Sequence, residues 1–194
     1  MRALKWVLTT FVVLFILAPL IVVAVVSFNQ NRYMDFPPEG FSLHWYAELW
    51  NDVGWRDAIV TSLLVAATSA ALAVVIATPM AFVLRAYDIR LAPAIFALGI
   101  LPFLLPPVIS ALGALVFWSS LGFSGRLENI IISHAIFFST LPLITVSLAM
   151  ETMDPALPEA AQTLGANPRT SFRTVTLPLL VPSMITGYAA AFVL

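Results

Sequence analysis

Residues 58–84 read AIVTSLLVAATSAALAVVIATPMAFVL, a stretch without a single charged side chain. A helix rises about 1.5 Å per residue, so about 20 apolar residues cross the ~30 Å hydrocarbon core of a bilayer. The stretch exceeds this length, and its serines and threonines carry no charge. It therefore predicts a transmembrane helix, and with it an all-α integral membrane protein.

Further uncharged runs of similar length follow the same rule, at residues 6–30, 91–125 and 129–150, and a fifth apolar run covers residues 174–194. Pro178 and Pro182 favour a fifth helix that starts near Pro182. Such a helix reaches only about 20 Å before the last residue, so we expect a polypeptide truncated within its fifth transmembrane helix. The predicted spans of this single transmembrane domain, residues 1–194, are 6–28, 58–84, 93–119, 129–150 and 180–194.

The composition excludes several classes of protein. The chain is 61% hydrophobic and 10% charged, whereas soluble domains carry about 25% charged residues. Its net charge of −1 provides no basic surface for nucleic acid. Cysteine is absent, and the two histidines, His44 and His134, are far apart. We therefore expect no catalytic residue, no metal site and no nucleic-acid partner, but contact with membrane lipid.

Basic residues orient the predicted spans. On one predicted side lie Arg2, Lys5, Arg85, Arg90, Arg169 and Arg173, whereas the other side carries three basic and six acidic residues. The positive-inside rule then places the N-terminus and the loop 151–179 in the cytoplasm. Trp45, Trp50, Trp55 and Trp118 fall at the outer side, as an aromatic belt would. The first run could instead be a cleaved signal peptide, although its apolar core exceeds the usual length of about 7–15 residues.

The predicted external loop, residues 29–57, contains the segment GFSLHWYAELW at 40–50. This segment can form a short helix with Trp45, Tyr46 and Trp50 on one face. We interpret it as an interfacial helix lying on the lipid headgroups, and a docking surface for an external partner is the alternative.

The third run is interrupted by Pro102, Pro106 and Pro107. Proline breaks a helix, and such a break is tolerated at membrane depth where protein or a water-filled cavity covers it. The prolines therefore indicate either a kinked helix that lines a translocation path or a bend needed only for packing. His134, in the fourth run, is the other candidate for the path, unless it lies at the external interface. No Asp or Glu lies deep within any run, which argues against a proton- or cation-coupled transporter.

The segment 153–182 reads MDPALPEAAQTLGANPRTSFRTVTLPLLVP. Asp154 can cap a helix that starts at Pro155, and Gly165 can end it. Asn167 and Pro168 then start a second helix. We expect two short helices at a sharp angle. One face of the first helix carries residues at i, i+3, i+4 and i+7: Leu157, Ala160, Ala161 and Leu164. Its small side chains allow close approach to a partner's groove, and a loop folded back on the bilayer is the alternative.

The same segment resembles the EAA loop of the permease subunits of binding-protein-dependent ABC importers. The family pattern is E-A-A, three residues, glycine, nine residues and I-x-L-P. Its positions fall on Glu159, Ala160, Ala161, Gly165, Leu177 and Pro178, with Val175 in place of isoleucine. The segments SFNQNRY and GFSLHWYAELW of the external loop, and SHAIFFSTLPLITVSLAMETMD at 133–154, resemble the spermidine/putrescine type.

The resemblance implies a polytopic helical bundle of the type I ABC importer permease kind in the bacterial inner membrane. It implies as partners two cytoplasmic ATPase subunits, a second permease subunit and a periplasmic substrate-binding protein. The chain lacks the G-x-x-x-x-G-K-[ST] phosphate loop, so it would bind no cofactor itself, and ATP and Mg²⁺ would bind the ATPase partner. The solute would be a polyamine or a similar small molecule. A secondary transporter or channel without an ATPase, and then a membrane-embedded enzyme, are the alternatives.

Overall fold

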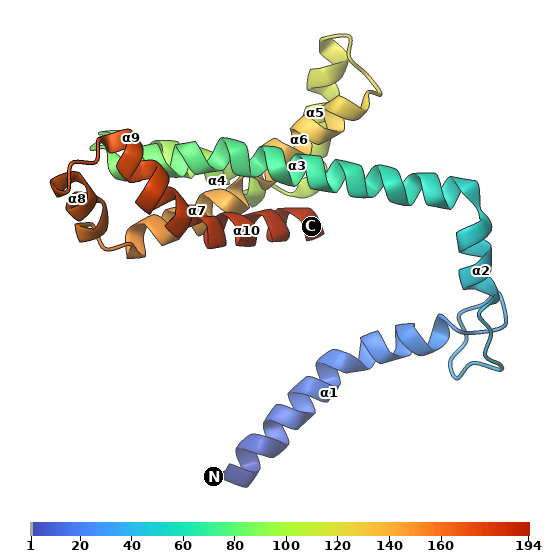
Figure 1. The fold of residues 1–194 in the computed structure, drawn as a ribbon. Helices are drawn as coiled ribbons and strands as arrows, with labels where there is room; N and C mark the ends of the chain where they lie inside the picture. Colours follow the sequence, from blue (N-terminus) through green and yellow to red (C-terminus); the bar gives the residue numbers. More distant parts are fainter. Residues whose placement is uncertain (1) are drawn as a thin grey trace. The chain divides into compact units, whose positions relative to one another are not determined.

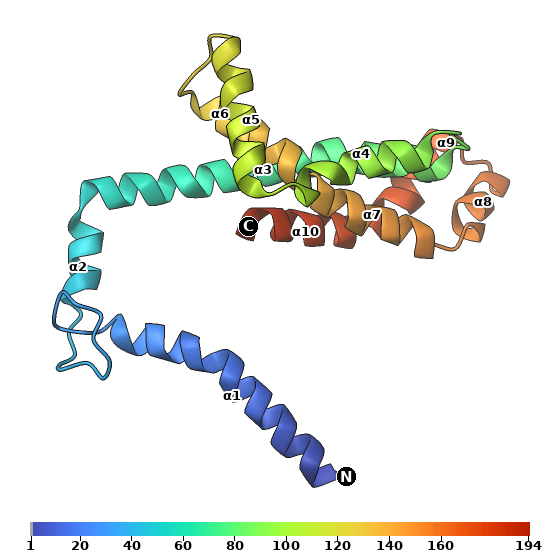
Figure 2. The same cartoon turned by 180° about the vertical axis from the view of Figure 1, so that it is seen from behind.

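The computed structural model describes residues 2–194. Met1, with which the predicted domain 1–194 begins, lies outside the described residues. The described part is helical, and its β-structure is limited to an isolated bridge between Asn29 and Phe41. The prediction of an all-α protein is confirmed. The chain divides into two compact units, up to Val60 and from Thr61 onward (Figures 1 and 2), and each is described by itself.

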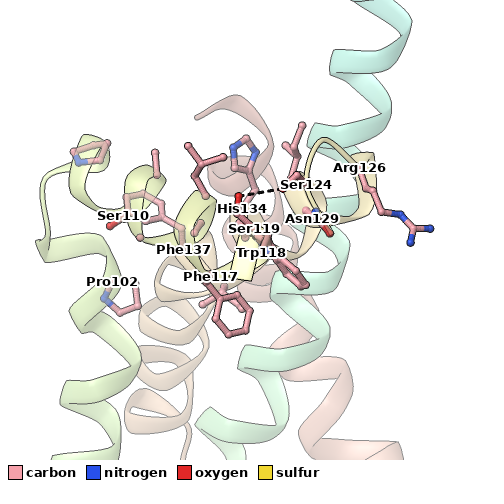
Figure 3. A pocket seen from close by; sticks show the side chains of 18 of the residues that line it. Pro102, Ser110, Phe117, Trp118, Ser119, Ser124, Arg126, Asn129, His134 and Phe137 are labelled. Atoms are coloured by element: carbon pink, nitrogen blue, oxygen red, sulfur yellow. Dashed lines mark hydrogen bonds between the residues drawn. The ribbon is translucent and has the colours of Figure 1, made fainter. Parts of the chain in front are cut away.

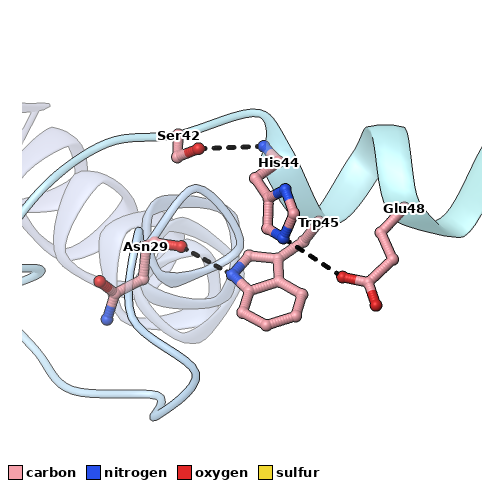
Figure 4. A network of polar contacts seen from close by, with 5 residues as sticks. All are labelled: Asn29, Ser42, His44, Trp45 and Glu48. Carbon is pink, nitrogen blue, oxygen red and sulfur yellow. Dashed lines mark hydrogen bonds and ion pairs between the residues drawn. The ribbon is translucent and has the colours of Figure 1, made fainter.

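The first unit contains α1 (Arg2–Val26), α2 (His44–Asn51) and the first turns of α3 (Val53–Ala86). Asn29, only 2% exposed, organises the loop between α1 and α2. Its side-chain amide donates to the Tyr33 carbonyl at 2.9 Å, and its backbone carbonyl accepts from the Trp45 indole at 3.0 Å (Figure 4). The segment expected at the interface thus contains a real helix, α2, with Trp45 fixed to the preceding loop.

The second unit comprises the rest of α3 and a series of shorter helices. They are α4 (Ala92–Leu104), α5 (Pro107–Ser120), α6 (Leu127–Phe138), α7 (Thr140–Thr152), α8 (Ala156–Thr163), α9 (Pro168–Ser171), the π-helix η1 (Phe172–Thr176) and α10 (Leu177–Val193).

Four helical segments of the described chain are long and apolar enough to cross a membrane: Leu4–Val26, Val53–Ala86, Leu127–Thr152 and Pro168–Val193. They overlap four of the five predicted spans. The helices α4 and α5 pass the same test together, but they are bent by 100° at the break between them. The interrupted third run is therefore more sharply broken than a kinked helix would be, because Pro106 and Pro107 follow each other where α5 begins.

The core of the second unit lies where α3, α7 and α10 meet. Its buried members are Ala77, Ala81, Leu143, Val146 and Leu180. Hydroxyl groups add bonds between the helices: Thr140 Oγ1 donates to the Gly99 carbonyl of α4, and Thr145 Oγ1 to the Ser183 carbonyl of α10, both at 3.0 Å. Helices in lipid associate through close packing and such hydrogen bonds, because lipid is as apolar as the side chains.

The closest approach between α7 and α10 occurs at Gly187. A Cβ atom built there would lie 2.5 Å from the Cα of Pro142 and 2.8 Å from Thr145 Oγ1. The first of these neighbours is backbone and cannot turn aside. Glycine at this position is therefore required by space, which sets the distance between the two helices.

The fifth helix begins earlier than predicted. We expected a start near Pro182, but α10 starts at Leu177, and Pro182 lies inside it. A proline at this position removes one backbone hydrogen bond. The packing of Leu180 in the core and the bond to the Ser183 carbonyl hold the helix on both sides of Pro182. Tertiary contacts thus extend the helix to residues before the proline that was expected to start it.

Replacing Gly187 with alanine should weaken the bundle, because the added methyl group meets the α7 backbone. We expect a loss of about 1–3 kcal/mol in stability, seen as a lower midpoint of thermal unfolding of the purified protein in detergent. Gly113 of α5 is the matched control, since a Cβ there meets nothing within 4 Å. Gly113→Ala should leave the midpoint unchanged or raise it, and an equal loss in both variants would refute the steric explanation.

Candidate functional site

The helix α8 carries the first part of the loop 151–179. Asp154 Oδ1 accepts a hydrogen bond from the Ala156 amide at 2.9 Å, so this side chain caps the helix as predicted, within one residue of the expected start. Gly165 has a φ of +93°. Its amide donates to the Gln162 carbonyl at 2.9 Å and the Ala166 amide to the Ala161 carbonyl at 3.0 Å, the two bonds of a Schellman motif. Local chemistry therefore defines both ends of α8.

The second part of the loop differs from the prediction. Asn167 Oδ1 accepts from the Thr170 amide at 2.9 Å and caps α9, but α9 does not end as a separate short helix. It continues through η1 into α10, so Leu177 and Pro178 are the first two residues of α10. A π-helix accommodates one extra residue and is common at functional sites. The loop thus consists of one separate helix, α8, followed by a helical segment, α9 and η1, that continues into the fifth span.

The predicted contact face of α8 remains uncovered in the second unit. Leu164 is 89% exposed and Leu157 47% exposed. Glu159 and Ala160 are exposed as well, and Ala161 is half-buried. The structure thus places Glu159, Ala160 and Ala161 together on one short helix with its apolar side available.

Two contacts tie this loop to the end of α3. The rings of Phe82 and Phe172 meet edge to face at 4.6 Å between centroids, which joins α3 to η1. Arg85, also near the end of α3, forms an ion pair with Glu151 of α7. In addition, Ser171 Oγ donates to the Pro158 carbonyl at 3.2 Å and holds α8 against α9. The loop is therefore fastened to α3 at two points and α8 is held against α9, while the outer face of α8 is free.

A pocket of about 740 Å³ lies between α4, α5, α6 and the turn that joins α5 to α6 (Figure 3). Pro102, Pro107 and His134, three of the residues predicted to line a path, form part of its wall. Pro106, the fourth, is at the break between α4 and α5 and is not among the lining residues. His134 of the fourth run and two of the three prolines of the third thus line the same pocket.

Aromatic and hydroxyl groups make up much of the pocket wall. The indole of Trp118 donates to Ser133 Oγ at 2.8 Å, and Ser124 Oγ donates to Ser119 Oγ at 3.1 Å. Ser110 Oγ is buried and has no hydrogen-bond partner. These serines were not predicted from the sequence. Ser119, Ser124 and Ser133 come together through the turn between α5 and α6, which no local pattern indicates.

One charged residue, Arg126, belongs to the pocket lining. Its guanidinium lies 5.7 Å from the centroid of the Phe123 ring and contacts the Glu128 carboxylate at 3.5 Å. Figure 3 shows its side chain directed away from the other labelled residues. Arg126 therefore adds no charge to the interior of the pocket, and His134 is the one other ionisable side chain in this lining.

Comparison with known proteins identifies the family. The spermidine/putrescine transport system permease protein PotC of Escherichia coli is 29% identical over 193 residues, which cover 100% of this chain and 73% of the relative. The putrescine transport system permease protein PotI of the same species is 31% identical over 188 residues, 93% of this chain and 66% of the relative. The chain belongs to the permease subunits of ABC importers.

This permease also resembles a Salmonella typhi protein named for 2-aminoethylphosphonate transport, with 28% identity over 181 residues, 92% of this chain and 68% of the relative. No protein-family model matches the sequence. The relatives and the long apolar helices make the permease a multi-pass inner-membrane protein of the spermidine/putrescine type. The relatives are named as permease proteins and not as enzymes.

Gly165→Ala should destabilise the end of α8 in the permease. A left-handed conformation costs an L-residue with a Cβ about 1–2 kcal/mol. Space is not the cause, since a Cβ there meets nothing within 4 Å. Hydrogen exchange of the Gly165 and Ala166 amides should become faster. Ala166→Gly is the control and should leave the Gly165 amide's exchange nearly unchanged; equal effects of both changes would disprove the conformational argument.

The contact between Phe82 and Phe172 should be measurable as a coupling energy. Aromatic pairs contribute about 0.5–1.5 kcal/mol beyond their buried area. A double-mutant cycle with Phe82→Leu and Phe172→Leu, read from thermal unfolding in detergent, should give a coupling in that range. The pair Phe11 and Phe15, neighbours on α1 at 6.4 Å, is the comparison for a contact within one helix. Strict additivity at Phe82 and Phe172 would show that η1 is not fastened to α3.

Proposed function

We propose that this permease forms part of the solute path across the inner membrane and is driven by ATPase subunits that bind the loop 151–179. The observation that carries the proposal is the helix α8, which is capped at both ends, fastened to its neighbours and left uncovered on one face. A short rigid helix with an apolar side fits a groove on a partner. Glu159 and Gln162, both exposed, are available for hydrogen bonds at the rim of that groove.

The orientation follows from the distribution of charge. Basic residues at the start of α1, at the end of α3 and in the loop 151–179 belong on the cytoplasmic side by the positive-inside rule. The N-terminus and α8 are then cytoplasmic, where ATPase subunits can reach α8. The loop 29–57 is periplasmic and can receive a substrate-binding protein.

In this proposal the permease pairs with a second permease subunit and with two ATPase subunits that bind ATP and Mg²⁺. Closure of the ATPases pushes on α8, and the contacts of Phe172 with Phe82 and of Glu151 with Arg85 pass the displacement to α3. The pocket beside His134 belongs to the solute path.

The solute is a polyamine or a similar small amine. The relatives are named for spermidine and putrescine, and one for 2-aminoethylphosphonate. These solutes share a primary amino group on a short aliphatic chain, although their net charges differ. The shared chemistry therefore defines the expected solute better than any one of the names.

The test is the capture of partners from membranes that contain the tagged permease. A soluble ATPase should co-purify with the unchanged permease, and Gly165→Asp should reduce its amount by about tenfold or more, which corresponds to ~1.4 kcal/mol of binding. Gly122→Asp is the matched control, because Gly122 also has a positive φ, of 78°, with nothing within 4 Å of its Cβ position. Mass spectrometry identifies and quantifies the proteins captured.

Capture of the ATPase by Gly122→Asp but not by Gly165→Asp would support coupling through α8. Equal capture by both variants would show that the ATPase binds the permease outside this loop. If no ATPase co-purifies with the unchanged permease, the proposed coupling through the loop 151–179 would fail.

A further inference from the structure

We propose that the pocket between α5 and α6 binds the primary ammonium group of a short aliphatic amine through aromatic faces and hydroxyl oxygens, without a carboxylate. This inference rests on the proposed function, since it takes the pocket as part of the solute path. The inference names the group that binds in the pocket, a primary ammonium, and the side chains that hold it.

The size and the aromatic wall of the pocket fit such a ligand. A volume of about 740 Å³ holds a small organic molecule. Phe117 and Trp118 on α5 and Phe137 on α6 are among the residues that line the pocket. The rings of Phe117 and Trp118 stand at 72° to each other with centroids 5.2 Å apart. They therefore offer ring surface in two directions, on which a cation binds by its charge and a methylene chain by apolar contact.

The wall also provides acceptors for the three N–H donors of an ammonium group. Ser110 Oγ is buried and has no partner among the described residues. Ser133 Oγ accepts from Trp118 and keeps a second lone pair. A buried hydroxyl without a partner in a native structure calls for an explanation, such as a ligand or water. Ser133 Oγ is therefore an acceptor that an ammonium group in the pocket would use directly, whereas Ser110 Oγ has almost no accessible surface and would accept only after its side chain turns toward the pocket.

The charges near the pocket favour an amine over an anion. The lining contains no aspartate or glutamate, and its one arginine, Arg126, is directed outward and paired with Glu128. An anion inside would find no free arginine or lysine. A cation inside would be held without a carboxylate, so it would bind weakly and leave readily. A solute path requires this balance, because tight binding at an intermediate site would stop transport.

The position of Trp118 makes it the main determinant. Its indole is fixed by the bond to Ser133, so the ring has a set orientation toward the pocket. Tryptophan is also the aromatic side chain that attracts cations most strongly. Phenylalanine at this position keeps a ring and most of the attraction, whereas leucine keeps only apolar volume.

The experiment measures amine binding to the purified permease in lipid nanodiscs without any ATPase, by saturation-transfer NMR on the methylene protons of the probe. Putrescine is the amine, 1,4-butanediol its uncharged analogue of equal chain length, and succinate its anionic counterpart. We expect putrescine to bind at least about fivefold more tightly than either analogue. Trp118→Leu should weaken putrescine binding by a similar factor, and Trp118→Phe by less than about twofold.

Two further variants keep the test decisive if Trp118→Leu does not fold. Ser110→Ala removes the unpartnered hydroxyl, and Phe137→Leu removes a ring that α6 contributes to the lining; each should weaken putrescine binding. Trp50→Leu is the matched control, because Trp50 is 72% exposed on α2, outside the pocket. It should bind putrescine as the unchanged permease does.

Each other outcome overturns the inference. Equal binding of 1,4-butanediol would make the pocket a site for polyols, and preference for succinate would make Arg126 the determinant. Equal loss in Trp50→Leu and Trp118→Leu, or no binding of putrescine, would place the amine elsewhere. Because no ATPase is present, this result is independent of the capture experiment: failure there with putrescine binding intact rejects the coupling but retains the site.

Discussion

The close contact of α7 with α10, where Gly187 meets Pro142, is the interaction on which the second unit depends. Side chains gain little by leaving lipid for a protein interior, so only close packing and hydrogen bonds hold these helices together. The absence of a side chain at Gly187 allows the backbones to approach, and Thr145 then reaches the Ser183 carbonyl. The same contact aligns Leu180 with Leu143 and Val146 in the core. The position of α10, and hence of the loop before it, follows from this approach.

Much of the fold could be predicted from sequence because the bilayer simplifies the problem. The uncharged run 58–84 lies inside α3, and the run 129–150 lies inside the helical segment Leu127–Thr152 formed by α6 and α7; both are long enough to cross a membrane. The ends of α8 were predictable as well, since Asp154 and Gly165 act through bonds to residues close in sequence. The start of α10 was not, because Pro182, expected at the start of the helix, lies inside it, and contacts with α7 hold the helix on both sides of this proline. Local signals failed where a distant helix decided the outcome.

In the candidate site, too, local features could be predicted and contacts between distant residues could not. Glu159, Ala160 and Ala161 could be assigned to one exposed helix because their spacing alone places them there. Pro102, Pro107 and His134 were predicted separately as residues of a path, and the structure brings them to one pocket. The partners Trp118 and Ser133 could not be foreseen. They are fifteen positions apart, and their contact depends on the turn between α5 and α6.

The π-helix η1 determines the angle by which α8 is rotated about the helix axis relative to α10. Its backbone bonds run to the fifth residue back, as from the Leu177 amide to the Phe172 carbonyl, so the segment holds one residue more than an α-helix of equal rise. One residue corresponds to about 100° of turn around a helix axis. If the segment 172–176 changed to α-helical bonding, α9 and the attached α8 would rotate by that angle relative to α10. A five-residue segment thus sets the direction in which the uncovered face of α8 points.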